Sequence, residues 1–356
     1  MPAEPARPRR DAATTGAVVV GAGALGTVYG AGLARAGVDV QLLARPAHAD
    51  AIQAAGGVQV TGPGGEWFAP LRATPDPAGL EPAALVVVLC KSHDTRAALA
   101  GLEHVRDGLE VAVSLQNGVE KDRILADWCG ADRVLGGMSM VGATLERPGV
   151  VAHTLPGTTY VGELAGGRSA RAEEVAARLE AGGMAAVASD RIVSAEWSKL
   201  VHAAPTMTLA ALTRLPFHRA LLDPGLARLH VALVREGAAI ARAAGTEVDD
   251  WPGMFPVRTL SALPEADAAE LLHERGRAMA AAGSTNVRIS MLADVEHGRP
   301  LEHEAVQGFL AAEAERLGID APLSVASATL LRALDASRQP ASAIGPLAET
   351  GGTRTE

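Results

Sequence analysis

The chain has 356 residues, which is enough for two domains of ordinary size. Hydrophobic residues make up 48% of it and aromatic residues only 3%, which is typical of a folded, alanine-rich protein and excludes a disordered one. Its formal net charge of -9 provides no general attraction for nucleic acid or anionic lipid, and we expect neither as a partner.

The first half of the chain predicts a doubly wound, Rossmann-type α/β domain over residues 17–190, after a disordered tail at 1–16 that lacks the apolar segment of a secretory signal. Short apolar runs alternate with helical patterns, as expected of parallel strands covered on both faces. These runs lie at residues 17–20, 38–44, 84–90 and 109–115. The uncharged stretch at 17–34 is glycine-rich, so a strand, turn and helix explain it better than a membrane span.

Two further segments of this domain predict antiparallel pairing. Residues 58–72 place a Pro-Gly-Gly turn between alternating segments, which indicates a hairpin at the edge of the sheet. Short runs with intervening turn signals over 133–163 indicate an antiparallel extension.

After about Asp190 the pattern changes to long stretches rich in alanine, leucine and arginine with helical spacing. We expect a second, all-helical domain over residues 191–336, followed by a disordered tail at 337–356. The apolar faces of these helices suggest a homodimer. Cys90 and Cys129 lack the close spacing of metal and redox motifs, so we expect no metal site and two buried free thiols in a reducing cytoplasm.

A glycine-rich turn follows the first apolar run directly. Gly21, Gly23 and Gly26, with Ala24 and Leu25 between them, stand between a strand and a helix. Glycines in this context allow a tight turn and a close approach to a diphosphate at the helix N-terminus. The alternative is a glycine-rich packing turn that holds no ligand.

The residue that ends the second strand indicates which dinucleotide would bind. An NAD site usually has an acidic residue there, but Arg45 stands 19 residues after Gly26 at that place. A guanidinium can form a forked contact with a ribose 2′-phosphate, so we predict NADPH as the cofactor. An ordinary solvated arginine is the alternative.

Two polar residues should reach the same edge of the sheet. Lys91 directly follows the apolar run at 84–90, and Asn117 follows the run at 109–115. Open α/β sheets bind ligands at the carboxyl ends of their strands, although a lysine or an Asn-Gly turn is also ordinary loop chemistry.

Lys199 follows Trp197 on a predicted helix that is largely apolar, so we expect its amine to face an interior cleft. Hydride transfer to a carbonyl carbon leaves negative charge on oxygen, and a partly desolvated lysine can donate the proton that neutralises it. The alternative is a lysine whose amine reaches solvent.

The stretches VVVLCKSHD, SLQNGVEK, EWSKLVHAA and ISMLADVEHGRPLEHEAVQG, read in this order after GAGALG, resemble the ketopantoate reductase family, the 2-dehydropantoate 2-reductases. The resemblance covers residues 17 to about 310. It implies that Lys91 and Asn117 line the nicotinamide end and that Lys199 is the general acid. It also implies that Glu302 pairs with this lysine and the substrate, and that Ser290 binds the substrate carboxylate or hydroxyl.

Two residues near these also have simpler interpretations. Gly298 separates Ser290 from Glu302 and should break the helix, so Glu302 could also be a helix-capping glutamate. Asp294 matches the SMLxD pattern of the family, and we interpret it as structural.

The chain departs from the family at two positions of the lysine helix. The family usually has K-L-x-x-N-x-x-x-N, whereas Ala203 and Met207 stand here in place of the asparagines that hold the substrate. His202, one turn from Lys199, is the candidate that compensates for them, and a partly buried histidine is the alternative. Pro205 should kink or shift the helix, which affects the register of this comparison.

We therefore expect an NADPH-dependent reductase that transfers hydride to the C=O or C=N group of a small molecule. The substrate is expected to be a larger or less polar 2-oxo acid, ketone or imine than ketopantoate, in specialised metabolism. The alternatives are a genuine 2-dehydropantoate 2-reductase of pantothenate biosynthesis and a non-catalytic NADPH-binding protein.

Overall fold

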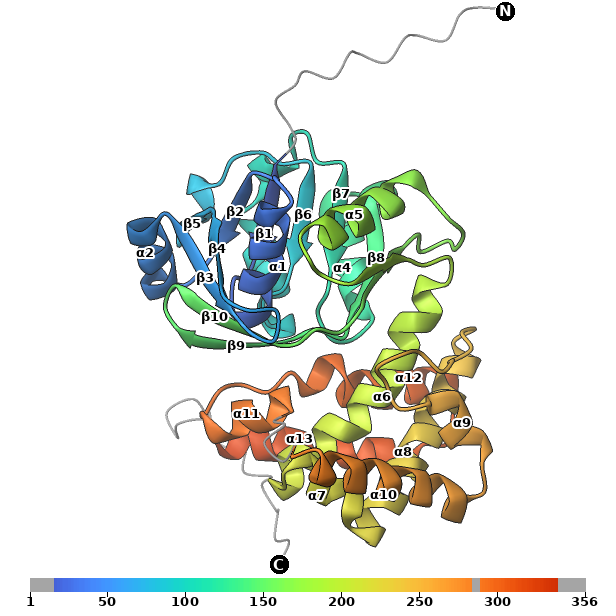
Figure 1. The fold of residues 1–356 in the computed structure, drawn as a ribbon. Helices are drawn as coiled ribbons and strands as arrows, with labels where there is room; N and C mark the ends of the chain where they lie inside the picture. The colour runs from blue at the N-terminus through green and yellow to red at the C-terminus, as the bar shows by residue number, and fades with distance from the viewer. Residues whose placement is uncertain (1–15, 284–288, 339–356) are drawn as a thin grey trace, which may run out of the picture. The chain divides into compact units, whose positions relative to one another are not determined.

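The computed structural model describes residues 16–283 and 289–338 (Figure 1). The chain divides into two compact units, one formed by Met1–Leu200 with Thr246–Val257 and the other by Val201–Gly245 with Arg258–Glu356. The tails expected at 1–16 and 337–356 lie almost wholly outside the described residues.

An eight-stranded sheet in the order β12-β11-β8-β7-β6-β1-β2-β5 forms the centre of the first unit. The strands from β8 to β5 all pair in parallel, and β11 is antiparallel to β8. The four apolar runs of the sequence form β1, β2, β6 and β7, which confirms the doubly wound α/β class. The strands are β1 (Ala17–Val20), β2 (Val40–Leu43), β5 (Arg72–Thr74), β6 (Leu85–Val88), β7 (Val111–Ser114), β8 (Val134–Ser139), β11 (Thr159–Gly162) and β12 (Ala186–Ala188).

A second, four-stranded sheet has the order β4-β3-β10-β9 and comprises β3 (Gly57–Thr61), β4 (Trp67–Pro70), β9 (Gly142–Arg147) and β10 (Val150–Leu155). The expected hairpin forms as β3 and β4, but its predicted place at the edge of the main sheet is wrong. Strand β5 occupies that edge, and β3 pairs with β10 instead. The physical reason is burial, because Val58, Val60 and Ala69 of the hairpin join the core around the first helix.

The expected antiparallel extension over 133–163 is right only in part. Strands β9 and β10 pair in antiparallel fashion, as do β8 and β11, but β8 extends the parallel sheet beside β7.

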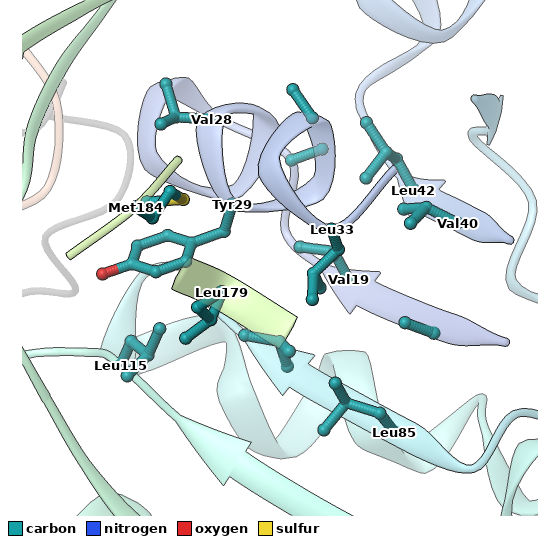
Figure 2. Packing of buried hydrophobic residues seen from close by; sticks show 14 of the residues in the cluster. Val19, Val28, Tyr29, Leu33, Val40, Leu42, Leu85, Leu115, Leu179 and Met184 are labelled. Carbon is teal, nitrogen blue, oxygen red and sulfur yellow. The ribbon is translucent and has the colours of Figure 1, made fainter. Parts of the chain in front are cut away.

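Helix α1 (Ala24–Arg35) lies at the centre of the packing in this unit, and Figure 2 shows its apolar side chains against those of the sheet. Tyr29 is fully buried, and its hydroxyl donates to Ser139 Oγ at 2.6 Å and lies 2.6 Å from Thr159 Oγ1. Burial raises the pKa of the Tyr29 phenol to about 12. The other helices of this unit are α2 (Pro46–Ala55), α3 (Thr95–Ala100), α4 (Glu120–Cys129) and α5 (Ala170–Ala181).

Helix α6 (Ile192–Thr213) begins in the first unit and continues in the second. It remains helical through Pro205, which lies inside it. Hydrogen bonds attach the segment at 246–257 to its first turns: Ser194 Oγ donates to Glu247 O at 2.8 Å, and Asp249 N donates to Ser198 Oγ at 2.8 Å. This segment therefore belongs to the first unit although helices of the second unit flank it in sequence.

The second unit is helical, as the sequence predicts. Within it α8 packs against α10, α12 and α13. Glu236 of α8 accepts hydrogen bonds from the backbone N–H groups of Leu323 at 3.0 Å and Ser324 at 2.7 Å, at the start of α13. The helices are α7 (Phe217–Leu222), α8 (Pro224–Ala243), α9 (Val257–Ala262), α10 (Glu265–Ala281), α11 (Ser290–Glu296), α12 (Gln307–Leu317) and α13 (Pro322–Ser337). Among the described residues, no helix combines the length and the apolar character needed to cross a membrane.

Candidate active site

The structure brings four of the predicted site segments to one edge of the main sheet. Strands β7, β6, β1 and β2 are consecutive neighbours and parallel, so their carboxyl ends lie side by side. Asn117, Lys91, Gly21 and Arg45 follow these strands in that order. This edge is where open α/β sheets bind their ligands.

The glycine turn leaves space at the start of α1. Gly21 has φ +90°, and a Cβ there would lie 2.3 Å from the backbone nitrogen of Cys90. A Cβ on Gly26 would lie 2.4 Å from the Gly21 carbonyl oxygen, whereas a Cβ on Gly23 would meet nothing within 4 Å. No side chain among the described residues caps the helix at Gly23, and its first turn carries no acidic residue. An anion can therefore approach the N–H groups of Ala24, Leu25 and Gly26 at this helix terminus.

Arg45 stands at the N-terminus of the next helix. It is the N-cap residue of α2, with Pro46 at the first helical position, and it is exposed. The helix terminus and the guanidinium both favour a negatively charged group.

Gln116 links the loop that carries Lys91 to the loop that carries Asn117. Its buried amide donates to Cys90 O and to Thr95 Oγ1, both at 2.7 Å, and accepts from Ser114 Oγ at 2.8 Å. The sequence analysis did not identify this residue, which lies in the quoted stretch SLQNGVEK. Cys90 is only half-buried, so the expectation that both thiols are buried is correct for Cys129 alone.

A buried charged cluster lies one helical turn from Lys199. Glu196 of α6 and Lys121 of α4 are 4% and 5% exposed, and Lys121 Nζ donates to Glu196 Oε1 at 2.5 Å and to Asp122 Oδ1 at 2.8 Å. The backbone N–H of Gly137 on β8 also donates to Glu196 Oε1, at 2.7 Å. The cluster thus joins three elements near the half-buried Lys199.

The cluster holds one cation between two carboxyl groups in a buried site. Burial raises the pKa of Glu196 to about 8, although Lys121 opposes this shift. Burial also lowers the pKa of Lys121, but the two carboxylates outweigh it and the net shift is upward. The sequence analysis singled out neither Lys121 nor Glu196, and the only signal for Glu196 is a charge before Trp197 in an apolar helix.

The residues that replace the family asparagines are buried in the second unit. Ala203 and Met207 are 8% and 3% exposed, whereas His202 is half-buried. Burial lowers the pKa of His230 on α8 to about 3, and the nearby His202 contributes to this. Thr206 Oγ1 donates to the His202 carbonyl at 2.9 Å and so adds a hydrogen bond beside Pro205.

Ser290 and Glu302 also belong to the second unit. Ser290 is the exposed first residue of α11, and this helix ends before Gly298, as expected. Glu302 is buried and is the N-cap residue of a short 3-10 turn, His303–Ala305, that precedes α12. Asp294 is 2% exposed and lies within 3.8 Å of Arg299 Nη1, which agrees with its interpretation as structural.

The predicted site residues form two sets, one in each unit. The glycine turn, Arg45, Lys91, Asn117 and Lys199 belong to the first unit, and the predicted substrate residues and Glu302 belong to the second. Their assigned roles stay predictions. In the part of the chain that the structure describes, no cluster of histidine, cysteine and acidic residues could hold a metal ion.

The parallel sheet, the glycine turn and the open helix N-terminus define a protein of the Rossmann-fold class. Comparison with family models then identifies the family. Residues 17–166 match the model described as ketopantoate reductase PanE/ApbA, and residues 191–335 match the model of its C-terminal domain. The chain belongs to the ketopantoate reductase family, and it is an oxidoreductase.

Relatives and solved structures agree with this assignment. The chain is 32% identical to a 2-dehydropantoate 2-reductase of Archaeoglobus fulgidus over 317 residues, which cover 89% of this chain and 97% of the relative. A ketopantoate reductase structure from Ralstonia eutropha has a TM-score of 0.76 at 27% identity and covers 91% of this chain and 99% of its own. A D-mandelate dehydrogenase structure with NADH and anilino(oxo)acetate shares the fold, with a TM-score of 0.76 at 20% identity over 90% of this chain and 99% of its own.

Proposed function

We propose that the protein is an NADPH-dependent reductase that acts on the carbonyl or imine group of a 2-oxo acid or a related ketone. The observation that carries the proposal is the open N-terminus of α1 at Gly23, which lies at the same sheet edge as Arg45, Lys91 and Asn117. The uncapped N–H groups there suit a diphosphate, and Arg45 at the start of α2 suits a 2′-phosphate.

The proposed roles of the cofactor and of the site residues follow from their chemistry. When bound, the cofactor supplies the hydride. Lys91 and Asn117 are proposed to line its nicotinamide end, because they follow β6 and β7, the next two strands on one side of β1. Lys199 donates a proton to the oxygen or nitrogen of the substrate, and Glu302 supports it.

The proposed substrate is a small molecule larger or less polar than ketopantoate. Ala203 and Met207 cannot replace the hydrogen bonds of two asparagines, and leaving polar groups of a small substrate unpaired weakens binding. Ser290 and His202 remain the proposed polar contacts of the substrate. A role in specialised metabolism and a cytoplasmic location accompany this proposal.

A second candidate is a genuine 2-dehydropantoate 2-reductase, the name that relatives at 31–32% identity carry. Oxidation of NADPH with ketopantoate, followed at 340 nm, separates the two candidates. Rapid turnover that is lost in Lys199→Ala would establish the second candidate. Binding of NADPH without turnover, with a gain of activity in Ala203→Asn, supports the first and directs the search to bulkier ketones and imines.

The cofactor is tested without knowledge of the substrate. We expect wild-type protein to bind NADPH more tightly than NADH, and Arg45→Ala to lose about tenfold or more in affinity for NADPH while NADH binding changes little. Arg123→Ala, an exposed arginine on α4, is the matched control and should leave both affinities unchanged. Equal affinity of wild-type protein for the two cofactors would refute the role of Arg45.

A further inference from the structure

Three hydrogen bonds form a continuous relay that ends at the glycine turn. The N–H of Gly149, in the turn between β9 and β10, donates to His48 Nδ1 at 3.0 Å. His48 Nε2 lies 2.9 Å from Thr27 Oγ1, and Thr27 Oγ1 donates to the Gly23 carbonyl at 2.6 Å. We refer to Gly149, His48, Thr27 and Gly23 as the relay.

The direction of the relay follows from its first member. A backbone N–H can only donate, so Nδ1 of His48 must be the acceptor and the ring proton must be on Nε2. This proton then points to Thr27 Oγ1, which leaves the threonine hydroxyl to donate to Gly23 O. Burial lowers the pKa of His48, which keeps the ring in the neutral form that this arrangement requires.

The relay ends on the peptide that faces the open space at the start of α1. The Gly23 carbonyl accepts two hydrogen bonds from Thr27, one from its backbone N–H at 3.0 Å and one from its hydroxyl at 2.6 Å. The N–H of Ala24 belongs to the same trans peptide and therefore points away from that carbonyl, out of the helix N-terminus. Fixing the carbonyl thus fixes the direction of a donor that is available to an anion.

All hydrogen-bond donors of the relay point in the same direction along the chain of hydrogen bonds, toward Gly23. Hydrogen bonds aligned in this way polarise one another, and a peptide whose carbonyl is strongly bonded has a better N–H donor. The side chains of Thr27 and His48 are 0% and 4% exposed, so bulk water does not compete for them. Neither residue was singled out from the sequence.

The relay also connects the two anion-binding helix termini. His48 lies in the first turn of α2, where its own N–H donates to the Arg45 carbonyl at 3.0 Å. The relay therefore ties the helix that begins at Arg45 to the helix that begins at Gly23. Because the relay begins at Gly149, between β9 and β10, it also links these two helices to the second sheet.

We propose that Thr27 and His48 are positioning residues for the cofactor diphosphate: they orient the Gly23-Ala24 peptide so that Ala24 N–H binds a phosphate oxygen. The inference rests on the proposed dinucleotide binding and adds two residues that do not touch the cofactor themselves. It requires no knowledge of the substrate, because cofactor binding alone reports on it.

The decisive variants are Thr27→Val, which removes the hydroxyl and keeps the branched shape, and Thr27→Ser, which keeps the hydroxyl. We expect the NADPH Kd to rise about tenfold in Thr27→Val, the effect of one hydrogen bond, and to stay within about twofold in Thr27→Ser. Thr213→Val is the matched control, because Thr213 Oγ1 also donates to a carbonyl four residues earlier at 2.6 Å, far along the chain from the turn.

Two further measurements separate positioning from mere stability. The Tm of each variant shows whether lost affinity only follows lost stability, and nitrogen NMR of the imidazole should show a neutral His48 with its proton on Nε2. The proposal is overturned if Thr27→Val binds NADPH like wild-type protein, if Thr27→Ser is equally impaired, or if the proton is on Nδ1. A wild-type protein that binds neither NADPH nor NADH would instead refute the proposed function itself, and the role of the relay with it.

Discussion

Replacing Lys121 with methionine tests whether the buried cluster is held by its single cation. The change keeps the length and apolar stem of the side chain but leaves Glu196 and Asp122 facing each other at 4% and 6% exposure. Removing one partner of a buried ion pair costs about 3–5 kcal/mol, because the remaining charge has lost its compensation. We expect Lys121→Met to lower the free energy of unfolding of the first unit by that amount.

Urea unfolding followed by tryptophan fluorescence measures this loss selectively. All four tryptophans, at positions 67, 128, 197 and 251, belong to the first unit. Arg123→Met on the same helix is the matched control: its ion pairs with Glu120 and Asp127 are exposed, and it should cost less than about 1 kcal/mol.

A triple variant completes the test. Replacing all three charged groups of the cluster, in Lys121→Met with Asp122→Leu and Glu196→Leu, should recover most of the lost stability, since apolar groups of similar volume often substitute well for buried ionic groups. The reasoning is refuted if Lys121→Met costs no more than Arg123→Met, or if the triple variant is less stable than Lys121→Met alone.

Three further predictions concern other parts of the chain. Burial raises the pKa of Glu196 to about 8 in the folded protein, so this carboxyl group releases its proton on unfolding. The free energy of unfolding should therefore fall by about 2 kcal/mol between pH 6 and pH 8. Urea titrations at several pH values measure this fall, and Glu196→Gln should abolish it. Gly21→Ala should lower stability by more than about 2 kcal/mol in the same assay, since its Cβ would meet the Cys90 backbone at 2.3 Å; a neutral effect would contradict the tight turn. Glu236→Gln should weaken the N-terminus of α13 by about 1 kcal/mol, measured as faster amide exchange there, and unchanged exchange would disprove the capping role.

Hydrophobic patterning predicted the main sheet correctly but could not place the hairpin. The runs that form β1, β2, β6 and β7 are apolar on both faces, and only a sheet covered on both sides buries them. The hairpin of β3 and β4 is recognised from its turn, but its partner β10 lies about 90 residues further along the chain. Local patterns carry no information about which distant strand offers its edge.

For the candidate site, too, one part was predictable from the sequence and another part was not. The sequence by itself determined that Gly21, Arg45, Lys91 and Asn117 follow strands of one parallel sheet, because strand direction fixes the edge to which each loop belongs. Only the tertiary structure decided that Lys121 meets Glu196, and that His48 connects Gly149 to Thr27. A polar side chain near a helix start is usually solvated, and its burial depends on partners 75 and 101 residues away in these two cases. Such pairings follow from the packing of whole elements, which no local spacing encodes.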